Sequence, residues 1–140
     1  MATNYTVGQG SFWSPRRVKQ GDTTLHIVFT PTTLAASDTY DFLYVPAGTF
    51  ITYLAMQVPD LDTAASPLIT LDVGDSGSAT RFVSASTAGQ AGGSVVATGI
   101  PRYYSTKDLL TWKVNAAADT AALLAVRIVV RLQVDPDGSP

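Results

Sequence analysis

Apolar and polar residues alternate in short runs over most of this chain, and the clearest run is the last one. From Leu123 to Val134, alternate residues beginning with Leu124 are apolar, whereas Arg127 and Arg131 belong to the other set. A period of two places the two sets on opposite faces of a strand. We therefore expect a long strand here, buried on one side.

Shorter strand-like runs precede it, and proline or glycine closes most of them. Two turn signals, Pro46-Ala47-Gly48 and the stretch from Gly74 to Ser78, favour hairpins between neighbouring runs. The Ala-rich loop over 115–120 is compatible with one helical turn. We expect strands over residues 24–30, 40–45, 50–58, 68–73, 80–85 and 109–114, with one or two weaker strands within 95–106.

The number and spacing of these runs indicate the fold class. About eight short strands without a convincing amphipathic helix are typical of a sandwich or barrel. We predict an all-β chain: a jelly-roll-like antiparallel β-sandwich with an extended N-terminal arm. The arm covers residues 1–22, where neither strand nor helix periodicity is sustained, the single sandwich domain covers 23–135, and a short tail covers 136–140.

Composition narrows the classes of function. Only 14% of the residues are charged, and 9 basic against 11 acidic side chains give a formal net charge of −2. Such a chain presents no broad positive field to nucleic acid or to an anionic membrane. The absence of Cys excludes disulfides and thiolate chemistry. With no signal peptide and no membrane-spanning stretch in the sequence, we expect synthesis in the cytoplasm and neither a membrane nor nucleic acid as partner.

The sequence contains few residues of the types that usually carry out catalysis. His26 is the one histidine, and it falls in the middle of a predicted strand. A zinc enzyme usually needs three protein ligands, and a serine hydrolase needs a histidine oriented beside its nucleophile. Because neither set can be assembled here, we interpret His26 as a structural or interface residue. We expect no catalysis, no metal and no cofactor.

Two pairs of aspartates come closest to a catalytic or cation-binding arrangement: Asp60 with Asp62, and Asp72 with Asp75. Both pairs lie in or next to predicted turns. Aspartate accepts hydrogen bonds from nearby backbone amides and tolerates turn geometry, so we expect the side chains to cap loops. Ligation of Ca²⁺ and acid–base catalysis remain the alternatives.

The predicted arm combines aromatic and basic residues, with Phe12 and Trp13 shortly before Arg16 and Arg17. Trp and Arg are enriched in the energetic hot spots of protein interfaces, and an extended arm can become ordered when it binds. We therefore predict that the arm docks on a protein surface. Folding over its own core and contact with nucleic acid are the alternatives.

A second group of aromatic residues, Tyr103, Tyr104 and Trp112, lies in predicted strands. Aromatic side chains in strands are usually cross-strand packing partners. A sugar-stacking platform is the alternative, and it would make the chain a carbohydrate- or receptor-binding module of a virion.

The combination of arm, turns and closing strand resembles the small jelly-roll head-decoration, or cement, proteins of tailed bacteriophages, most closely that of a Bordetella phage. The similar segments are the polar arm, the turn from Asp41 to Thr49, the turn from Val73 to Gly77 with Arg81-Phe82 after it, and the strand from Ala125 to Val134.

This resemblance implies a structural virion protein rather than an enzyme. Such a protein binds the outer surface of the assembled capsid, forms a homodimer and joins neighbouring capsomers, with the major capsid protein as its partner. The family has no catalytic residues to transfer. Candidate contact residues therefore come from the residue patterns alone: Phe12, Trp13, Arg16 and Arg17 in the arm, and Arg127 and Arg131 on the exposed face of the last strand.

Overall fold

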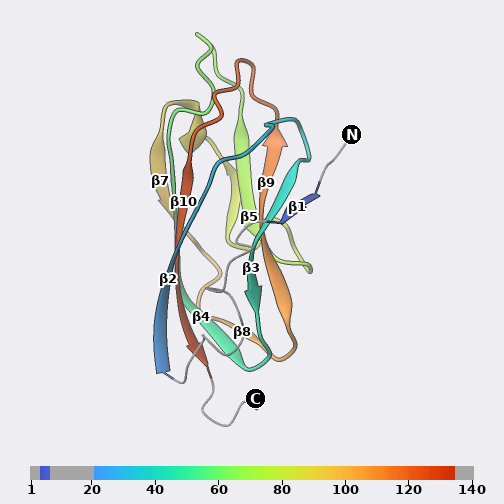
Figure 1. Cartoon of the computed structure of the whole chain (residues 1–140), viewed down its shortest axis with the longest axis vertical. Helices are drawn as coiled ribbons and strands as arrows, with labels where there is room; N and C mark the ends of the chain where they lie inside the picture. Colours follow the sequence, from blue (N-terminus) through green and yellow to red (C-terminus); the bar gives the residue numbers. More distant parts are fainter. Residues whose placement is uncertain (1–3, 7–20, 135–140) are drawn as a thin grey trace.

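The computed structural model describes residues 4–6 and 21–134 of the chain. This part contains ten strands and one short 3-10 helix (Figure 1). The elements are β1 (Asn4–Thr6), β2 (Gly21–Phe29), β3 (Thr39–Val45), β4 (Thr49–Val58), β5 (Thr70–Gly74), β6 (Val83–Ser86), η3 (Ala88–Gln90), β7 (Gly93–Val96), β8 (Arg102–Tyr104), β9 (Asp108–Ala116) and β10 (Val126–Val134).

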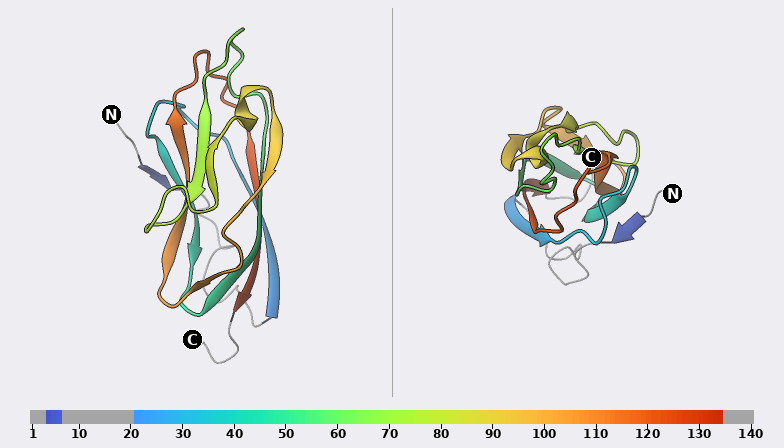
Figure 2. Two further views of the ribbon diagram at one scale, coloured as in Figure 1. Left: turned by 180° about the vertical axis from the view of Figure 1, so that it is seen from behind. Right: turned by 90° about the horizontal axis from the view of Figure 1, so that it is seen from above.

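The strands form two sheets that pack as two layers along the long axis of the molecule (Figures 1 and 2). One sheet has the order β1-β3-β9-β5-β6, and the other has the order β2-β10-β4-β7, with β8 also paired to β4. All pairings are antiparallel except the one between β1 and β3, which is parallel. The predicted all-β, jelly-roll-like sandwich is confirmed.

Several element boundaries differ from the prediction. β10 begins at Val126, so Leu124 is exposed instead of buried in the core face. The helical turn considered for residues 115–120 is absent, because Asn115 and Ala116 extend β9. Strand β1 lies within the segment expected to lack regular structure, and β2 begins at Gly21. No helix in the described ranges is long and apolar enough to cross a membrane.

The core between the sheets is centred on a cluster of three aromatic rings. Phe29 from β2 packs against Tyr40 from β3 and Trp112 from β9, with ring centroids 5.4 to 5.5 Å apart. The indole nitrogen of Trp112 lies 3.1 Å from the sulfur of Met56 in β4. Because the four residues come from both sheets, this cluster joins the layers, as edge-to-face aromatic pairs do in protein cores.

Two of the predicted turns depend on glycine. Gly48, between β3 and β4, has φ of +83°, a left-handed conformation that side chains with a Cβ rarely adopt. At Gly74 a Cβ would lie 2.0 Å from the carbonyl oxygen of Ser78, so the backbone of the β5–β6 turn approaches too closely for any other residue. The turn at Gly48 sets the start of β4, which carries part of the candidate site, and the turn at Gly74 shapes the β5–β6 hairpin of the other sheet.

Candidate contact surface

The outer face of the β2-β10-β4-β7 sheet carries the two arginines predicted on the last strand. Arg127 and Arg131 are both exposed, because their neighbours Val126, Ile128, Val130 and Leu132 point into the core. The register places a row of side chains from β4 and β7 beside them. We call this surface the arginine face, and it comprises Arg127, Val129, Arg131, Gln133, Tyr53, Ala55, Gln57 and Val96.

A row of apolar residues crosses the middle of the arginine face. Val129 of β10 lies opposite Ala55 of β4, and Ala55 lies opposite Val96 of β7. Directly opposite residues share one face of a sheet, so these three side chains form a continuous stripe. Val96 is 59% exposed. The stripe is apolar surface that remains in contact with solvent in the isolated chain.

The charges on this face are all positive. No Asp is among its residues, and neither arginine forms an ion pair with any residue in the described ranges. The guanidinium of Arg131 lies 5.7 Å from the ring centroid of Tyr53, which orients it without neutralising its charge. Uncompensated guanidinium groups beside an apolar stripe are suited to a protein surface that offers carboxylates or carbonyl oxygens.

An aromatic pair extends the arginine face toward the end of β10. Phe50 of β4 lies opposite Gln133 on one side and Tyr103 of β8 on the other. The rings of Phe50 and Tyr103 are 4.6 Å apart, and Phe50 is 38% exposed. Sequence patterns missed Phe50, because its orientation depends on the bulge between Arg131 and Leu132 that shifts the register of β4.

The other residues proposed from the sequence have different positions. Phe12, Trp13, Arg16 and Arg17 lie outside the described residues. Trp112 is fully buried and Tyr104 is 4% exposed, so the hypothesis of a sugar-stacking platform is wrong for both residues.

The aspartate at the β5–β6 turn holds that turn against β8. Asp75 accepts hydrogen bonds of 2.6 Å from the Nε of Arg81 and the hydroxyl of Tyr104, and further ones from the backbone of Gly77 and Ser78. Burial raises the pKa of Asp75, but the hydrogen bonds outweigh burial and leave the pKa below its ordinary value of 3.8. The predicted role in loop capping is confirmed.

Asp62 has the same role between the β4–β5 and β9–β10 loops, which its carboxylate joins. Burial raises the pKa of Asp62, but hydrogen bonds from the backbone of Thr120, Leu68, Asp119 and Ala64 outweigh burial and hold the pKa well below 3.8. Asp60 and Asp72 each accept one backbone hydrogen bond, from Asp62 and Ala85. Within the described ranges, no group of residues is arranged to hold a metal ion. The donors to Asp62 are the N–H groups of Ala64, Leu68, Ile69, Asp119 and Thr120.

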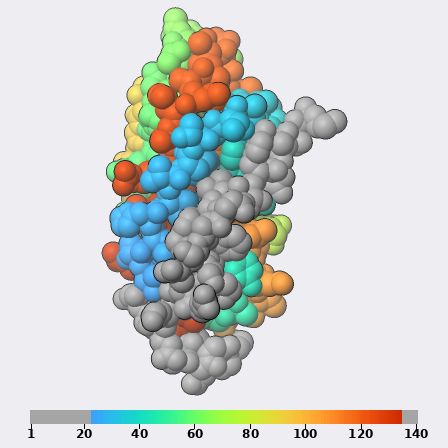
Figure 3. Space-filling view, in the orientation of Figure 1, coloured from blue at the N-terminus to red at the C-terminus, as the bar shows by residue number. Residues whose placement is uncertain are grey.

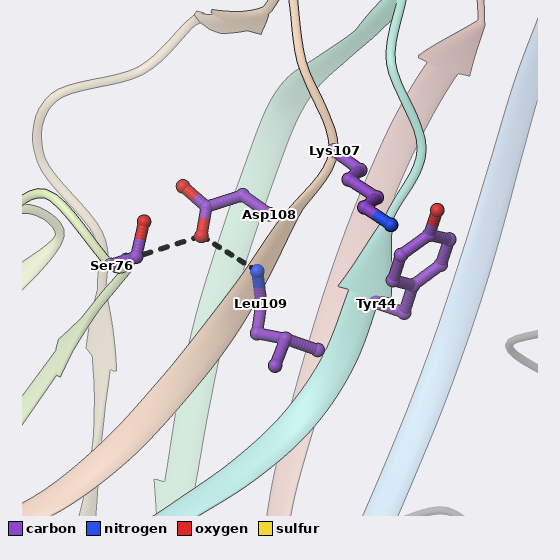
Figure 4. A pocket seen from close by; sticks show the side chains of 5 residues that line it. All are labelled: Tyr44, Ser76, Lys107, Asp108 and Leu109. Carbon is purple, nitrogen blue, oxygen red and sulfur yellow. Dashed lines mark hydrogen bonds between the residues drawn. The ribbon is translucent and has the colours of Figure 1, made fainter.

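A hollow of about 390 Å³ lies on the outer surface of the other sheet (Figure 4). The carboxylate of Asp108 accepts hydrogen bonds from the backbone of Ser76 and Leu109, at 3.2 and 2.7 Å. The ammonium of Lys107 points toward the ring of Tyr44. Because backbone donors occupy the carboxylate of Asp108, the hollow presents the Lys107 ammonium and apolar walls. It does not present a pair of catalytic groups.

Comparison with solved structures finds chains from phage capsids. A chain in a structure described as the capsid asymmetric unit of cyanophage Pam1 is 34% identical, with 82% of this chain and 87% of that chain covered and a TM-score of 0.70. The chain belongs to a family of phage capsid proteins. It is therefore a structural component of a virion.

Two further capsid structures share the fold of this capsid protein. A chain from the capsid of Ralstonia phage GP4 is 24% identical, covers 96% of this chain and 99% of its own length, and has a TM-score of 0.70. A chain from the acid-stable capsid of Helicobacter pylori bacteriophage KHP30 is 12% identical, with coverages of 85% and 91% and a TM-score of 0.61. No protein-family model and no curated protein matches the sequence.

Proposed function

We propose that this capsid protein is a decoration, or cement, protein. It binds the outer surface of the assembled shell, with the major capsid protein as its partner, and joins neighbouring capsomers as a homodimer without catalysing a reaction. The observation that carries the proposal is the arginine face, in which an apolar stripe lies between two arginines that form no ion pair with any residue the structure describes.

The chemistry of this face is suited to a repeated contact on a shell. Its few charges limit the cost of removing water from the surface, and apolar and aromatic residues with arginine are typical of interface centres. The predicted arm, through Phe12, Trp13, Arg16 and Arg17, adds a second contact in the proposal. Many modest contacts repeated over a shell strengthen binding through multivalency.

The test is cosedimentation with shells assembled from the major capsid protein encoded in the same genome. The wild-type chain is expected to sediment with the shells and to raise the temperature at which they disassemble. The double variant Arg127→Ala/Arg131→Ala is expected to bind at least about tenfold more weakly, because each arginine supplies charge-assisted contacts.

Lys107→Ala is the matched control, since it removes an exposed cation from the opposite sheet. It is expected to bind like the wild type. Binding of a soluble ligand without any binding to shells would refute the cement function. Equal binding by the double arginine variant would mean that another surface makes the contact.

A further inference from the structure

One end of the molecule consists of two loops that are linked by hydrogen bonds. The first connects β4 to β5 and the second connects β9 to β10, and both appear at the upper end of Figure 1 and Figure 3. Besides the shared carboxylate of Asp62, the N–H of Thr63 donates to Thr120 at 2.9 Å, and the N–H of Ala122 donates to Leu61 at 3.0 Å. The loops are therefore held in one conformation.

These ordered loops expose large apolar side chains. Leu68, Leu123 and Leu124 are 57%, 47% and 48% exposed. We call the three residues and their loops the leucine tip. Single exposed leucines are common on protein surfaces, but three of them on a short pair of loops, with alanines around them, are characteristic of an interaction site. Because the backbone is already ordered, binding there loses little conformational entropy.

The charge of the leucine tip indicates the chemistry of its partner. The two loops contain no Lys or Arg, and their surface charge comes from Asp119, which is exposed, and Asp60, which is half-buried, because Asp62 is buried. Two copies meeting tip to tip would bring these acidic groups together. Charge complementarity therefore favours a partner with an apolar depression bordered by Lys or Arg. The arginine face, by contrast, requires a partner that offers carboxylates or carbonyl oxygens.

We propose that the leucine tip is a second docking surface, which binds an apolar, basic-bordered depression on a neighbouring subunit of the shell. This inference rests on the proposed cement function. The two surfaces differ in charge and lie on different parts of the molecule, so one chain is able to contact two unlike regions of a shell at once. Joining such regions is what cementing requires.

The test compares shell binding by the wild type, Leu123→Ser/Leu124→Ser and the control Leu109→Ser, which replaces a leucine of β9 that is 41% exposed. The tip variant is expected to bind at least about tenfold more weakly with an unchanged melting temperature, because both leucines are exposed in the free chain. The control is expected to bind like the wild type. Asp119→Lys is expected to weaken binding as well.

Each contrary result has a distinct meaning. If the wild type fails to bind shells, the cement function itself is refuted. If the wild type binds and the tip variant binds equally well, the function stands and the tip inference is overturned. Tighter binding by Asp119→Lys would overturn the inference that the partner's depression is bordered by Lys or Arg. Light scattering measures the molecular mass in solution. If the mass falls from that of a dimer to that of a monomer only in the tip variant, a second copy of the chain occupies the leucine tip, and the inference of a shell partner is overturned.

Discussion

Asp62 illustrates how a single side chain organises a distant pair of loops. Its carboxylate accepts hydrogen bonds from two loops that are far apart in the sequence. Among the donors are the N–H groups of Leu68 and Asp119, at 2.7 and 2.9 Å. Backbone donors favour the ionised form, so the carboxylate is most effective when it is charged. Asp62, one of the four aspartates considered for cation binding or catalysis, therefore has the structural role that turn chemistry predicted.

Replacing Asp62 by Asn tests this role. The amide keeps one acceptor oxygen but directs its own N–H groups at backbone donors, so we expect the melting temperature at pH 7 to fall by on the order of 5 °C or more. Thermal unfolding followed by circular dichroism measures the effect. Asp119→Asn is the control, because Asp119 is exposed and its contact with Asp62 is through the backbone.

The pH dependence of the same variant gives a second measurement. The pKa of Asp62 is lower in the folded chain than its ordinary value of 3.8, so its contribution to stability is complete above that pH and is lost as the pH falls below it. The wild type should therefore lose stability steeply below about pH 4. Asp62→Asn should show a shallower decline, and parallel curves for the two proteins would contradict the assignment.

At the scale of elements, the β5–β6 hairpin depends on one close backbone contact. A Cβ on Gly74 would lie 2.0 Å from the oxygen of Ser78, a distance that only a shift of the backbone relieves. We expect Gly74→Ala to destabilise the fold by about 1 to 3 kcal/mol, the range typical of overpacking. Chemical denaturation measures this value.

Gly93→Ala provides the matched control for the hairpin. The nearest atom to a Cβ at Gly93 is 3.8 Å away, which is an ordinary contact. This substitution should change the free energy of unfolding by far less than the one at Gly74. Equal effects would show that the turn tolerates a side chain and that the close approach is not what determines its shape.

The elements also show which features a sequence pattern predicts. The alternation in 126–134 identified β10 and the outward orientation of Arg127 and Arg131, because a strand buried on one side has a period of two. The pattern did not reveal that Phe50 and Val96 lie on the same face. Their positions depend on pairing between distant strands and on a bulge, which are tertiary features.

Two hypotheses about single residues also show what a sequence pattern can and cannot predict. Turn chemistry correctly predicted that Asp62 and Asp75 cap loops, because that role follows from local backbone geometry. The alternative of a sugar platform at Trp112 and Tyr104 required knowledge of which face of each strand is buried. In β8, three residues are too few for periodicity to decide which side of Tyr104 is buried. In β9, Leu110, Trp112 and Val114 alternate with Thr111 and Lys113, so the pattern itself favoured a buried Trp112.

At the scale of the whole molecule, the predicted arm and the sandwich are expected to contribute separately to binding and stability. Deleting residues 1–20 removes β1 from the edge of its sheet, but every core residue in the described part of the chain lies after Gly21. The deletion should therefore weaken binding to shells more than it lowers the melting temperature. Cosedimentation and calorimetry on the same preparation compare the two effects. If binding and melting temperature fall together, the arm belongs to the core of the fold.

The position of β10 has a consequence for how this protein is made. The last strand of the described chain lies in the interior of its sheet, between β2 and β4, and not at an edge. Among the described strands, β2 therefore has no partner until β10 has been synthesised, and until then β4 pairs only with β7 and β8. A premature stop codon before Val126 would remove the strand that joins β2 to β4, so we expect incomplete chains not to form this sheet.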